Sequence, residues 1–184
     1  MGSPFFVFFL FEQLAREGRI EQMLEMMRDK WGFMIERGAT TFWETFPGFM
    51  KDRWTRSWCH AWSSAPTYFL TTEVLGVYPE EPGFSVVRVA PHPADIVRCR
   101  GRVPTPHGDV EVSWERGEGF SLEFRMPQNL KAHVVLPASG DLWANDERVS
   151  PESPPEGVER SVVRDELTEL WLGRGGEWKL EVKA

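Results

Sequence analysis

The chain has 184 residues, which is enough for one large domain or two small ones. Hydrophobic residues make up 41% of it, so the sequence predicts a packed core and argues against global disorder. The net charge of −7 argues against a nucleic acid or an anionic membrane surface as the partner.

The first strongly apolar segment, residues 5–11, reads FFVFFLF. No basic segment precedes it and no small-residue cleavage site follows it, so the pattern does not indicate a signal peptide. It is also far too short to span a membrane. The two cysteines, Cys59 and Cys99, fit neither a disulfide framework nor a zinc site, which favours reduced thiols and a cytoplasmic protein.

The first predicted helix covers residues 4–17. Ser3 suits the N-cap position, Pro4 the first helical position, and Gly18 the end of the helix. Apolar side chains surround its first two turns, which predicts a helix that is buried on nearly all sides.

A second helix is predicted over residues 19–37 and ends at Gly38. Its apolar residues recur at steps of three and four, and they are Ile20, Met23, Leu24, Met27, Trp31, Met34 and Ile35. Because the connection to the first helix is very short, the two helices should form an antiparallel hairpin. A third helix is predicted over residues 65–75, with Ser64 as its cap and Gly76 as its stop.

From residue 79 onward the pattern changes. Residues 79–83 (PEEPG) are rich in turn formers and predict a hinge. Beyond it, apolar and polar residues alternate in several short runs, which predicts an antiparallel β-sandwich or barrel. The alternating apolar residues are Val110, Val112 and Trp114; Phe120, Leu122, Phe124 and Met126; Leu170 and Leu172; and Trp178, Leu180 and Val182. Turns are predicted at 107–109 and 116–119, and an exposed proline-rich loop at 150–157.

The predicted fold class is therefore α+β in two parts, with helical hairpins over residues 1–78 and a β-sandwich over residues 79–184. Three helices, of which the first is almost wholly apolar, would leave a large apolar surface uncovered. The helical part is thus expected to be a piece of a larger helical assembly. Self-association into a homo-oligomer would also cover that surface.

The most informative stretch is residues 38–44 (GATTFWE), which places Glu44 directly after Trp43 and ahead of a long aromatic loop. A carboxylate can take a proton from the water that attacks an anomeric carbon, so Glu44 is the candidate general base of a glycosidase. Trp43 could exclude bulk water and stack on the sugar. The alternative is that Glu44 caps or salt-bridges a nearby helix end, since one Trp–Glu pair is a weak motif.

A second cluster, residues 59–66 (CHAWSSAP), contains His60 and Trp62. His60 could hydrogen-bond a sugar hydroxyl or orient the carboxylate, and Trp62 is either a sugar platform or core packing. Nine tryptophans against two tyrosines favour carbohydrate as the ligand, although any single tryptophan is more often part of the core.

The remaining histidines, His92, His107 and His133, lack metal-ligand spacing and are interpreted as turn or surface residues. The sequence contains no phosphate-binding loop, dinucleotide fingerprint or nucleophile elbow. It therefore predicts neither a metal nor a cofactor.

A series of short motifs follows in a fixed order along residues 3–116. In chain order they are SPFF, WG, GATTFWE, CHAWS, AP, LGV, PGF, PH and PTPHG. The ordered series resembles the C-terminal part of bacterial α-L-rhamnosidases, which form glycoside hydrolase family 78. The strands after residue 116 are similar to that family in character alone.

The resemblance implies a six-hairpin (α/α)6 barrel as the catalytic domain, followed by a C-terminal β-sandwich, and an inverting mechanism. It implies that Glu44 is the general base, that Trp43 contacts the sugar, and that His60 lies in the substrate pocket, with Trp62 as a further substrate-binding residue. The implied ligand is a rhamnose-containing glycoside. The two carboxyl groups of an inverting glycosidase lie about 6.5–9.5 Å apart, which leaves room for a water.

In that family the general acid lies upstream in the barrel, so this chain is expected to carry the base without the acid. Losing the acid removes leaving-group protonation, an effect on the order of 10²–10⁴ in rate. The chain should be inactive alone and active with a complementing barrel fragment. Two alternatives stay open: a non-catalytic carbohydrate-binding or assembly module, and a different six-hairpin sugar hydrolase.

Overall fold

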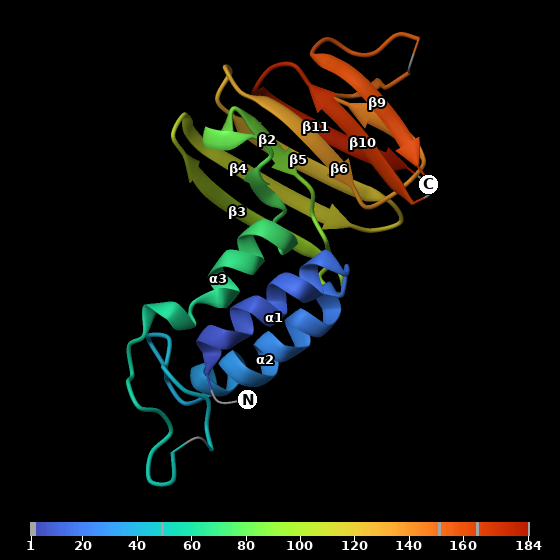
Figure 1. Ribbon diagram of the computed structural model, residues 1–184. Helices are drawn as coiled ribbons and strands as arrows, with labels where there is room; N and C mark the ends of the chain where they lie inside the picture. The colour runs from blue at the N-terminus through green and yellow to red at the C-terminus, as the bar shows by residue number, and fades with distance from the viewer. Residues whose placement is uncertain (1–2, 49, 151, 165, 184) are drawn as a thin grey trace. The chain divides into compact units, whose positions relative to one another are not determined.

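The structure, a computed structural model, describes residues 3–48, 50–150, 152–164 and 166–183. It divides into two compact units that meet between Leu70 and Thr71 (Figure 1). We refer to residues 1–70 as the helical unit and to residues 71–184 as the β unit. The domain division after residue 78 stays a prediction. Within the described ranges, no helix combines the length and the apolar character that crossing a membrane requires.

The helical unit begins with the predicted hairpin. Helix α1 (Pro4–Arg16) and helix α2 (Ile20–Glu36) are joined by a tight turn in which Gly18 has a φ of +69°, a conformation that favours glycine. Their facing sides bury the apolar residues that recur at helical spacing, namely Val7, Phe11, Leu14, Met23, Leu24, Met27, Trp31 and Met34. The Met stripe of α2 is therefore core, as its spacing indicates.

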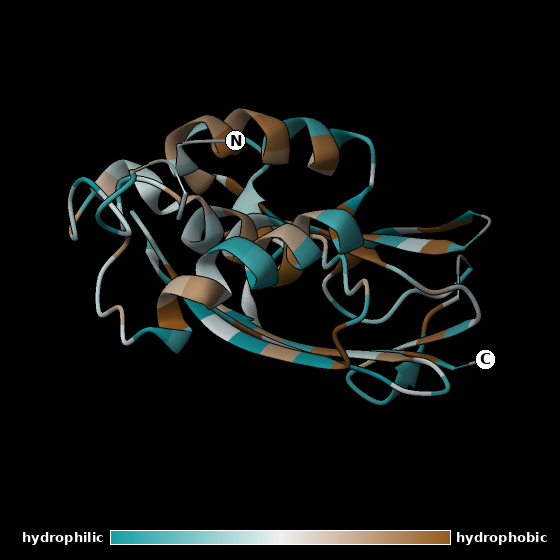
Figure 2. Cartoon of the chain, turned by 90° about the horizontal axis from the view of Figure 1, so that it is seen from below, coloured by the Kyte–Doolittle hydropathy of each residue, from teal (hydrophilic) through white to brown (hydrophobic). Residues whose placement is uncertain are grey.

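Helix α1 is not buried on nearly all sides, so that prediction is wrong for this chain. Phe5, Phe6 and Phe9 are exposed, and the first turns of α1 next to the N-terminus are brown in the hydropathy view (Figure 2). The predicted uncovered apolar surface is present. Ser3 occupies the N-cap position but makes no capping side-chain hydrogen bond, so the proline at the first helical position is what marks this helix start.

The third helical segment covers the predicted residues with a change of winding. A 3-10 turn, η1 (Ala61–Ser63), precedes α3 (Ala65–Phe69), and a π-helical segment, η2 (Leu70–Val74), follows it. Ser64 does not cap α3, because its hydroxyl donates to the carbonyl oxygen of Ala61 at 2.6 Å. Gly76 follows with a φ of +83°, and a Cβ there would lie 2.3 Å from the nitrogen of Pro91, so glycine is required on both counts.

The β unit consists of two sheets. The five-stranded sheet A has the order β1 (Val77–Pro79), β2 (Val86–Val89), β6 (Lys131–Leu136), β10 (Leu167–Leu172), β9 (Val158–Arg164). The six-stranded sheet B has the order β3 (Arg98–Thr105), β4 (Gly108–Arg116), β5 (Phe120–Met126), β11 (Gly176–Lys183), β7 (Asp141–Ala144), β8 (Glu147–Arg148). The two sheets form two layers with the core between them (Figure 1).

The alternating apolar residues named from the sequence are all buried. In sheet B, Trp114 on β4, Leu122 on β5 and Leu180 on β11 lie in adjacent register positions and point into the core. Sheet A contributes the buried Leu170 and Leu172 from β10. Period-two alternation therefore identified the inner face of four strands correctly.

Two features of the β unit differ from the prediction. The sandwich is not wholly antiparallel, because β2 pairs with β6 in parallel register, from Val86 opposite Lys131 to Val89 opposite Val134. The predicted hinge at residues 79–83 is the connection of a β1–β2 hairpin, which includes the short turn η3 (Pro82–Phe84). Turn-forming residues mark a reversal of the chain, and the pairing of its flanks makes this one a hairpin.

Candidate functional site

The segment that follows α2 folds back on itself as an irregular hairpin, which we call the ribbon, with one limb before Pro47 and the other after Met50. The amide of His60 donates to the carbonyl oxygen of Phe42 at 2.8 Å, and the amide of Glu44 donates to that of Ser57 at 3.0 Å. Pro47 and Gly48, which has a φ of +87°, lie in the loop that closes the ribbon. These contacts bring the two sequence clusters, around Glu44 and around His60, side by side.

A pair of buried threonines fixes the ribbon near its closed end. The hydroxyls of Thr45 and Thr55 are 3.3 Å apart, and the Thr55 hydroxyl also accepts from the Thr45 amide at 3.1 Å. The Thr55 hydroxyl donates to the carbonyl oxygen of Ser57 at 3.0 Å, and the amide of Arg56 donates to the Thr45 hydroxyl at 3.3 Å. Because these polar groups are buried and satisfied, they hold the neighbouring Glu44 and Arg56 backbones in a defined place.

Glu44 lies beside one cation. The Nε of Arg56 is 3.8 Å from Oε1 of Glu44. The side chain of Arg56 is 60% exposed, and that of Glu44 is 26% exposed. The alternative suggested by the sequence, that Glu44 pairs with a helix end, is not what the structure shows, because its partner is in the same ribbon. The partly sheltered carboxylate of Glu44 can accept a proton from water.

Three indoles gather around this carboxylate-bearing ribbon. Trp43 is buried, with 3% of its surface exposed, whereas Trp54 and Trp58 are 48% and 52% exposed. The rings of Trp43 and Trp54 are stacked, with centroids 6.0 Å apart, and the ring of Trp58 meets Trp43 edge-on at 4.8 Å. In this chain Trp43 is the support of the cluster, and Trp54 and Trp58 are its exposed surface.

His60 lines an apolar pocket of about 450 Å³. The other lining residues are Trp31, Met34, Ile35, Ala39, Thr40, Thr41, Phe42, Cys59 and Ala61. Glu44 and Trp62 do not line it. Trp62 is 70% exposed, and its ring packs against Phe5 of α1 with centroids 5.5 Å apart. The structure thus brings Glu44, Trp43 and His60 into one ribbon and places Trp62 on a neighbouring surface.

A hollow of about 960 Å³, larger than the pocket beside His60, lies in the β unit on the face of sheet B opposite the core. Its charged side chains pair with their neighbours across the strands, as Arg125 does with Glu111 at 3.0 Å and Arg102 with Asp109 at 3.3 Å. Such a self-neutralising ladder is a stable solvated surface. We therefore assign the candidate site to the ribbon of the helical unit, because its carboxylate, histidine and indoles suit a sugar better than the larger hollow on sheet B does.

The histidines of the β unit have structural partners. His92 lies 3.2 Å from the carboxylate of Glu73, and a ring nitrogen of His107 lies 3.1 Å from the carbonyl oxygen of Gly83. His133, predicted to be a turn or surface residue, is instead buried in strand β6. Throughout the described ranges, no group of three or more histidine, cysteine, aspartate or glutamate side chains could hold a metal ion.

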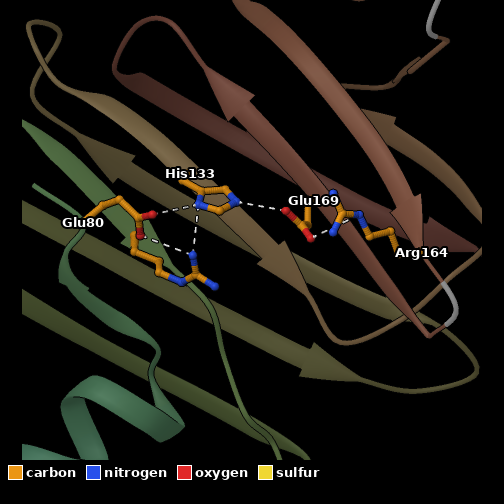
Figure 3. A network of polar contacts seen from close by, with 5 residues as sticks. Glu80, His133, Arg164 and Glu169 are labelled. Carbon is orange, nitrogen blue, oxygen red and sulfur yellow. Dashed lines mark hydrogen bonds and ion pairs between the residues drawn. The ribbon is translucent and has the colours of Figure 1, made fainter. Parts of the chain in front are cut away.

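His133 joins the polar network of Figure 3. Its Nδ1 lies 3.0 Å from Nη1 of Arg88 and 3.3 Å from Oε1 of Glu80, and its Nε2 lies 3.3 Å from Oε2 of Glu169. Arg164 completes the network with its Nε 3.9 Å from Glu169. Burial raises the pKa of Glu80, but the hydrogen bond from His133 and the charge of Arg88 outweigh it and bring that pKa below its usual value.

Sequence reasoning missed Arg56, Trp54 and Trp58. The signal was available in the WTRSW stretch at residues 54–58, where two indoles flank a cation in alternation. These residues belong to the candidate site because the pairing within the ribbon places them opposite Glu44. No local sequence pattern predicts that pairing.

Two models of protein families match the chain in succession. Residues 1–74 match the bacterial alpha-L-rhamnosidase 6 hairpin glycosidase domain, and residues 76–150 match the bacterial alpha-L-rhamnosidase C-terminal domain. Among characterised proteins, an alpha-L-rhamnosidase of Alteromonas sp. is 29% identical over 150 residues, and one of Formosa agariphila is 25% identical along 100% of this chain. The matches cover 75% of this chain in the first case.

Solved structures agree with these matches. The rhamnosidase of glycoside hydrolase family 78 from Bacillus sp. GL1 is 41% identical with a TM-score of 0.71, covering 74% of this chain and 15% of that one. The Streptomyces avermitilis alpha-L-rhamnosidase complexed with L-rhamnose covers 83% of this chain and 15% of that one, with a TM-score of 0.68 and 21% identity, which bears on the fold alone. The chain spans 16% and 20% of the length of the Alteromonas and Formosa relatives.

Proposed function

Because this chain belongs to the bacterial α-L-rhamnosidase family, we propose that it is the C-terminal portion of an inverting hydrolase that removes terminal α-L-rhamnose from glycosides. The successive matches to the six-hairpin and C-terminal domain models support the assignment, as does the similarity to the Bacillus sp. GL1 rhamnosidase. The single observation that carries the chemistry is Glu44 in the ribbon, partly sheltered and 3.8 Å from Arg56.

In the proposed reaction Glu44 is the general base. Its carboxylate takes a proton from a water, and that water attacks the anomeric carbon from the face opposite the leaving group. Arg56 orients the carboxylate, and His60 donates to or accepts from a sugar hydroxyl. Trp43 and Trp62 stay proposed substrate-binding residues, and the burial of Trp43 makes its contribution that of a support behind the sugar.

The helices of this chain would form the last part of an (α/α)6 barrel. The match of residues 1–74 to the six-hairpin model supports this placement. So does the exposed apolar surface of α1, made by Phe5, Phe6 and Phe9, because neighbouring barrel helices would cover it. The β unit would be the terminal sandwich of the same enzyme.

We also propose that the general acid is contributed by barrel helices other than those of this chain. An inverting enzyme needs the acid about 6.5–9.5 Å from the base, across the sugar. In the described part of the ribbon, Glu44 is the carboxylate that the structure places with the indoles and His60. Activity would then require the complementing part of the barrel as a neighbouring segment or as a separate polypeptide.

The test is hydrolysis of an aryl α-L-rhamnoside by this chain, alone and mixed with a polypeptide that carries the other barrel helices. We expect turnover in the mixture, at least about 10²-fold above the chain alone, and its loss in Glu44→Gln. Glu36→Gln, on an exposed glutamate at the end of α2, is the matched control and should leave turnover unchanged.

Two outcomes would contradict the proposal. Robust turnover by the isolated chain that vanishes in Glu44→Gln would show that the chain carries its own acid. Saturable binding of rhamnose, with turnover absent from every mixture, would indicate a non-catalytic carbohydrate-binding module instead.

A further inference from the structure

We propose that Trp54 and Trp58 form an aromatic platform that binds the pyranose ring of a glycoside beside Glu44. The inference rests on the proposed function, because it takes the ribbon as the place where the sugar lies. It gives these two indoles the direct stacking contact that the sequence suggested for Trp43.

The two indoles are exposed yet held in place. About half of each side chain is accessible, while the ring of Trp54 stacks on the buried Trp43 and the ring of Trp58 meets it edge-on. Trp54 also meets Phe33 of α2 edge-on at 6.5 Å. A side chain that is already fixed loses little conformational entropy when a ligand stacks on it, so the cluster is preorganised for binding.

The backbone of the platform is fixed as well. Trp54 directly precedes the buried Thr55, whose hydroxyl bonds to both Thr45 and Ser57. On the other side, the hydroxyl of Thr41 donates to the carbonyl oxygen of Trp58. Both indoles are therefore anchored to the opposite limb of the ribbon within one residue of their own positions.

A cation and a carboxylate accompany the two indoles in the ribbon. Arg56, midway between Trp54 and Trp58 in sequence, presents guanidinium donors, and Glu44 presents carboxylate acceptors 3.8 Å from it. A pyranose offers apolar C–H faces to an indole and hydroxyls to such groups at its rim. The 6-methyl group of a 6-deoxyhexose adds apolar surface on the same ring.

The charge around the platform distinguishes a sugar from a covering protein segment. The exposed phenylalanines of α1 lie in a stretch of residues 4–11 without a charge, which suits a neighbouring helix. The platform lies in residues 51–58, which read KDRWTRSW and carry four charged side chains. Charged residues are depleted from the cores of protein interfaces, so the platform surface suits a hydroxyl-rich ligand better than a packed helix.

The experiment uses the 184-residue chain labelled with ¹⁵N in its nine tryptophans, titrated with methyl α-L-rhamnoside and, as the polyol control, with glycerol. We expect the indole N–H signals of Trp54 and Trp58 to shift saturably with the rhamnoside alone. The signals of Trp114 and Trp178, in the core of the β unit, should stay still and report that the fold is intact.

Variants test the platform independently of signal assignment. Trp54→Ala and Trp58→Ala should each raise the apparent Kd about tenfold, the loss expected for one stacking contact. Trp143→Ala, on a half-buried indole of strand β7 in the β unit, is the control and should leave the Kd unchanged.

Each other outcome overturns the platform and has a distinct bearing on the proposed function. Shifts confined to Trp62 would indicate that the sugar binds near His60. They would contradict the platform without contradicting the proposed function. Absence of any shift would also contradict the platform. The Glu44-dependent turnover assay with the other barrel helices would then test the proposed function separately. Unchanged KM in Trp54→Ala and Trp58→Ala of an active mixture would show a rhamnosidase whose sugar lies elsewhere.

Discussion

At the scale of single residues, the clearest electrostatic device is the network around His133. Arg88 and Glu80 compete for one ring nitrogen: the guanidinium can donate to Nδ1 of a neutral ring, whereas a protonated ring donates to Glu80. Both contacts are drawn in Figure 3. Whichever form the ring takes, Glu80 keeps a partner, because Nη1 of Arg88 also lies 3.2 Å from its carboxylate.

Glu80→Gln should make the stability of the chain less dependent on pH. The folded-state pKa of Glu80 is lowered, so its contribution is present above the unfolded value of 4.5 and is lost as pH falls through the folded pKa. We expect Glu80→Gln to lower the free energy of unfolding by at most about 1 kcal/mol near pH 7, since solvent screens a partly exposed carboxylate. The difference should shrink at an acidic pH well below 4.5, as the wild-type carboxyl takes up its proton.

Urea unfolding of both proteins at the two pH values checks this. Glu118→Gln, on an exposed glutamate in the β4–β5 turn, is the matched control and should behave as wild type at both. A destabilisation by Glu80→Gln that is equally large at low pH would mean that packing, rather than charge, is lost.

At the scale of secondary-structure elements, the core of the sandwich depends on a few fully buried side chains. Leu122 on β5 is one of them and lies between Trp114 of β4 and Leu180 of β11. We expect Leu122→Ala to lower the free energy of unfolding of the β unit by about 3–5 kcal/mol, through lost burial and the cavity left behind. Ser121→Ala, on the opposite face of the same strand, should change it by less than about 0.5 kcal/mol.

Denaturant unfolding followed by near-ultraviolet circular dichroism, which reports on the packed indoles, measures both variants. A Leu122→Ala chain as stable as the Ser121→Ala chain would show that the two sheets are not packed on this face.

Local patterns predicted most of these elements. The bounds of α1 and α2 follow from proline at a start, glycine at an end and apolar spacing between, all of which act within one turn. The inner faces of β4, β5, β10 and β11 follow from alternation, because one face of each strand is solvated. The π-helical winding at Leu70–Val74 has no such signal, and helical spacing alone cannot distinguish it from an α-helix.

Pairing between distant segments could not be predicted in the same way. The parallel pairing of Val86–Val89 with β6 joins residues 45 positions apart, and short strands such as β1 offer too few residues for a pattern. The candidate site shows the same limit: Glu44 was recognised from its own motif, while the role of Arg56 depends on its pairing with the opposite limb of the ribbon. The roles of Glu44, Trp43, His60 and Trp62 in binding or catalysis stay predictions.

At the scale of the whole molecule, the uncovered apolar surface of α1 predicts self-association of the isolated chain. Phe6 and Phe9 are exposed and adjacent on the helix, and burying them between two copies removes apolar area from water. We expect sedimentation at micromolar concentration to detect a dimer or larger species, and Phe9→Lys to shift it toward monomer. Val163→Lys, on an exposed valine of β9, is the control and should not.

A monomer at every concentration would contradict this prediction. Addition of the complementing barrel helices should also dissociate the self-associated species, because a second copy of the chain and the added helices compete for the same phenylalanines.

The position of β11 in sheet B has a consequence for how the protein folds during synthesis. This strand, Gly176–Lys183, follows all others in the chain yet lies between β5 and β7. Until the ribosome has made residues 176–183, sheet B exists as two separate pieces, and the edges of β5 and β7 that pair with β11 have no partner there. The helical hairpin can form as it emerges from the ribosome, whereas sheet B can be completed only after β11 has been synthesised. In that interval the nascent chain exposes unpaired strand edges, the state in which aggregation competes with folding.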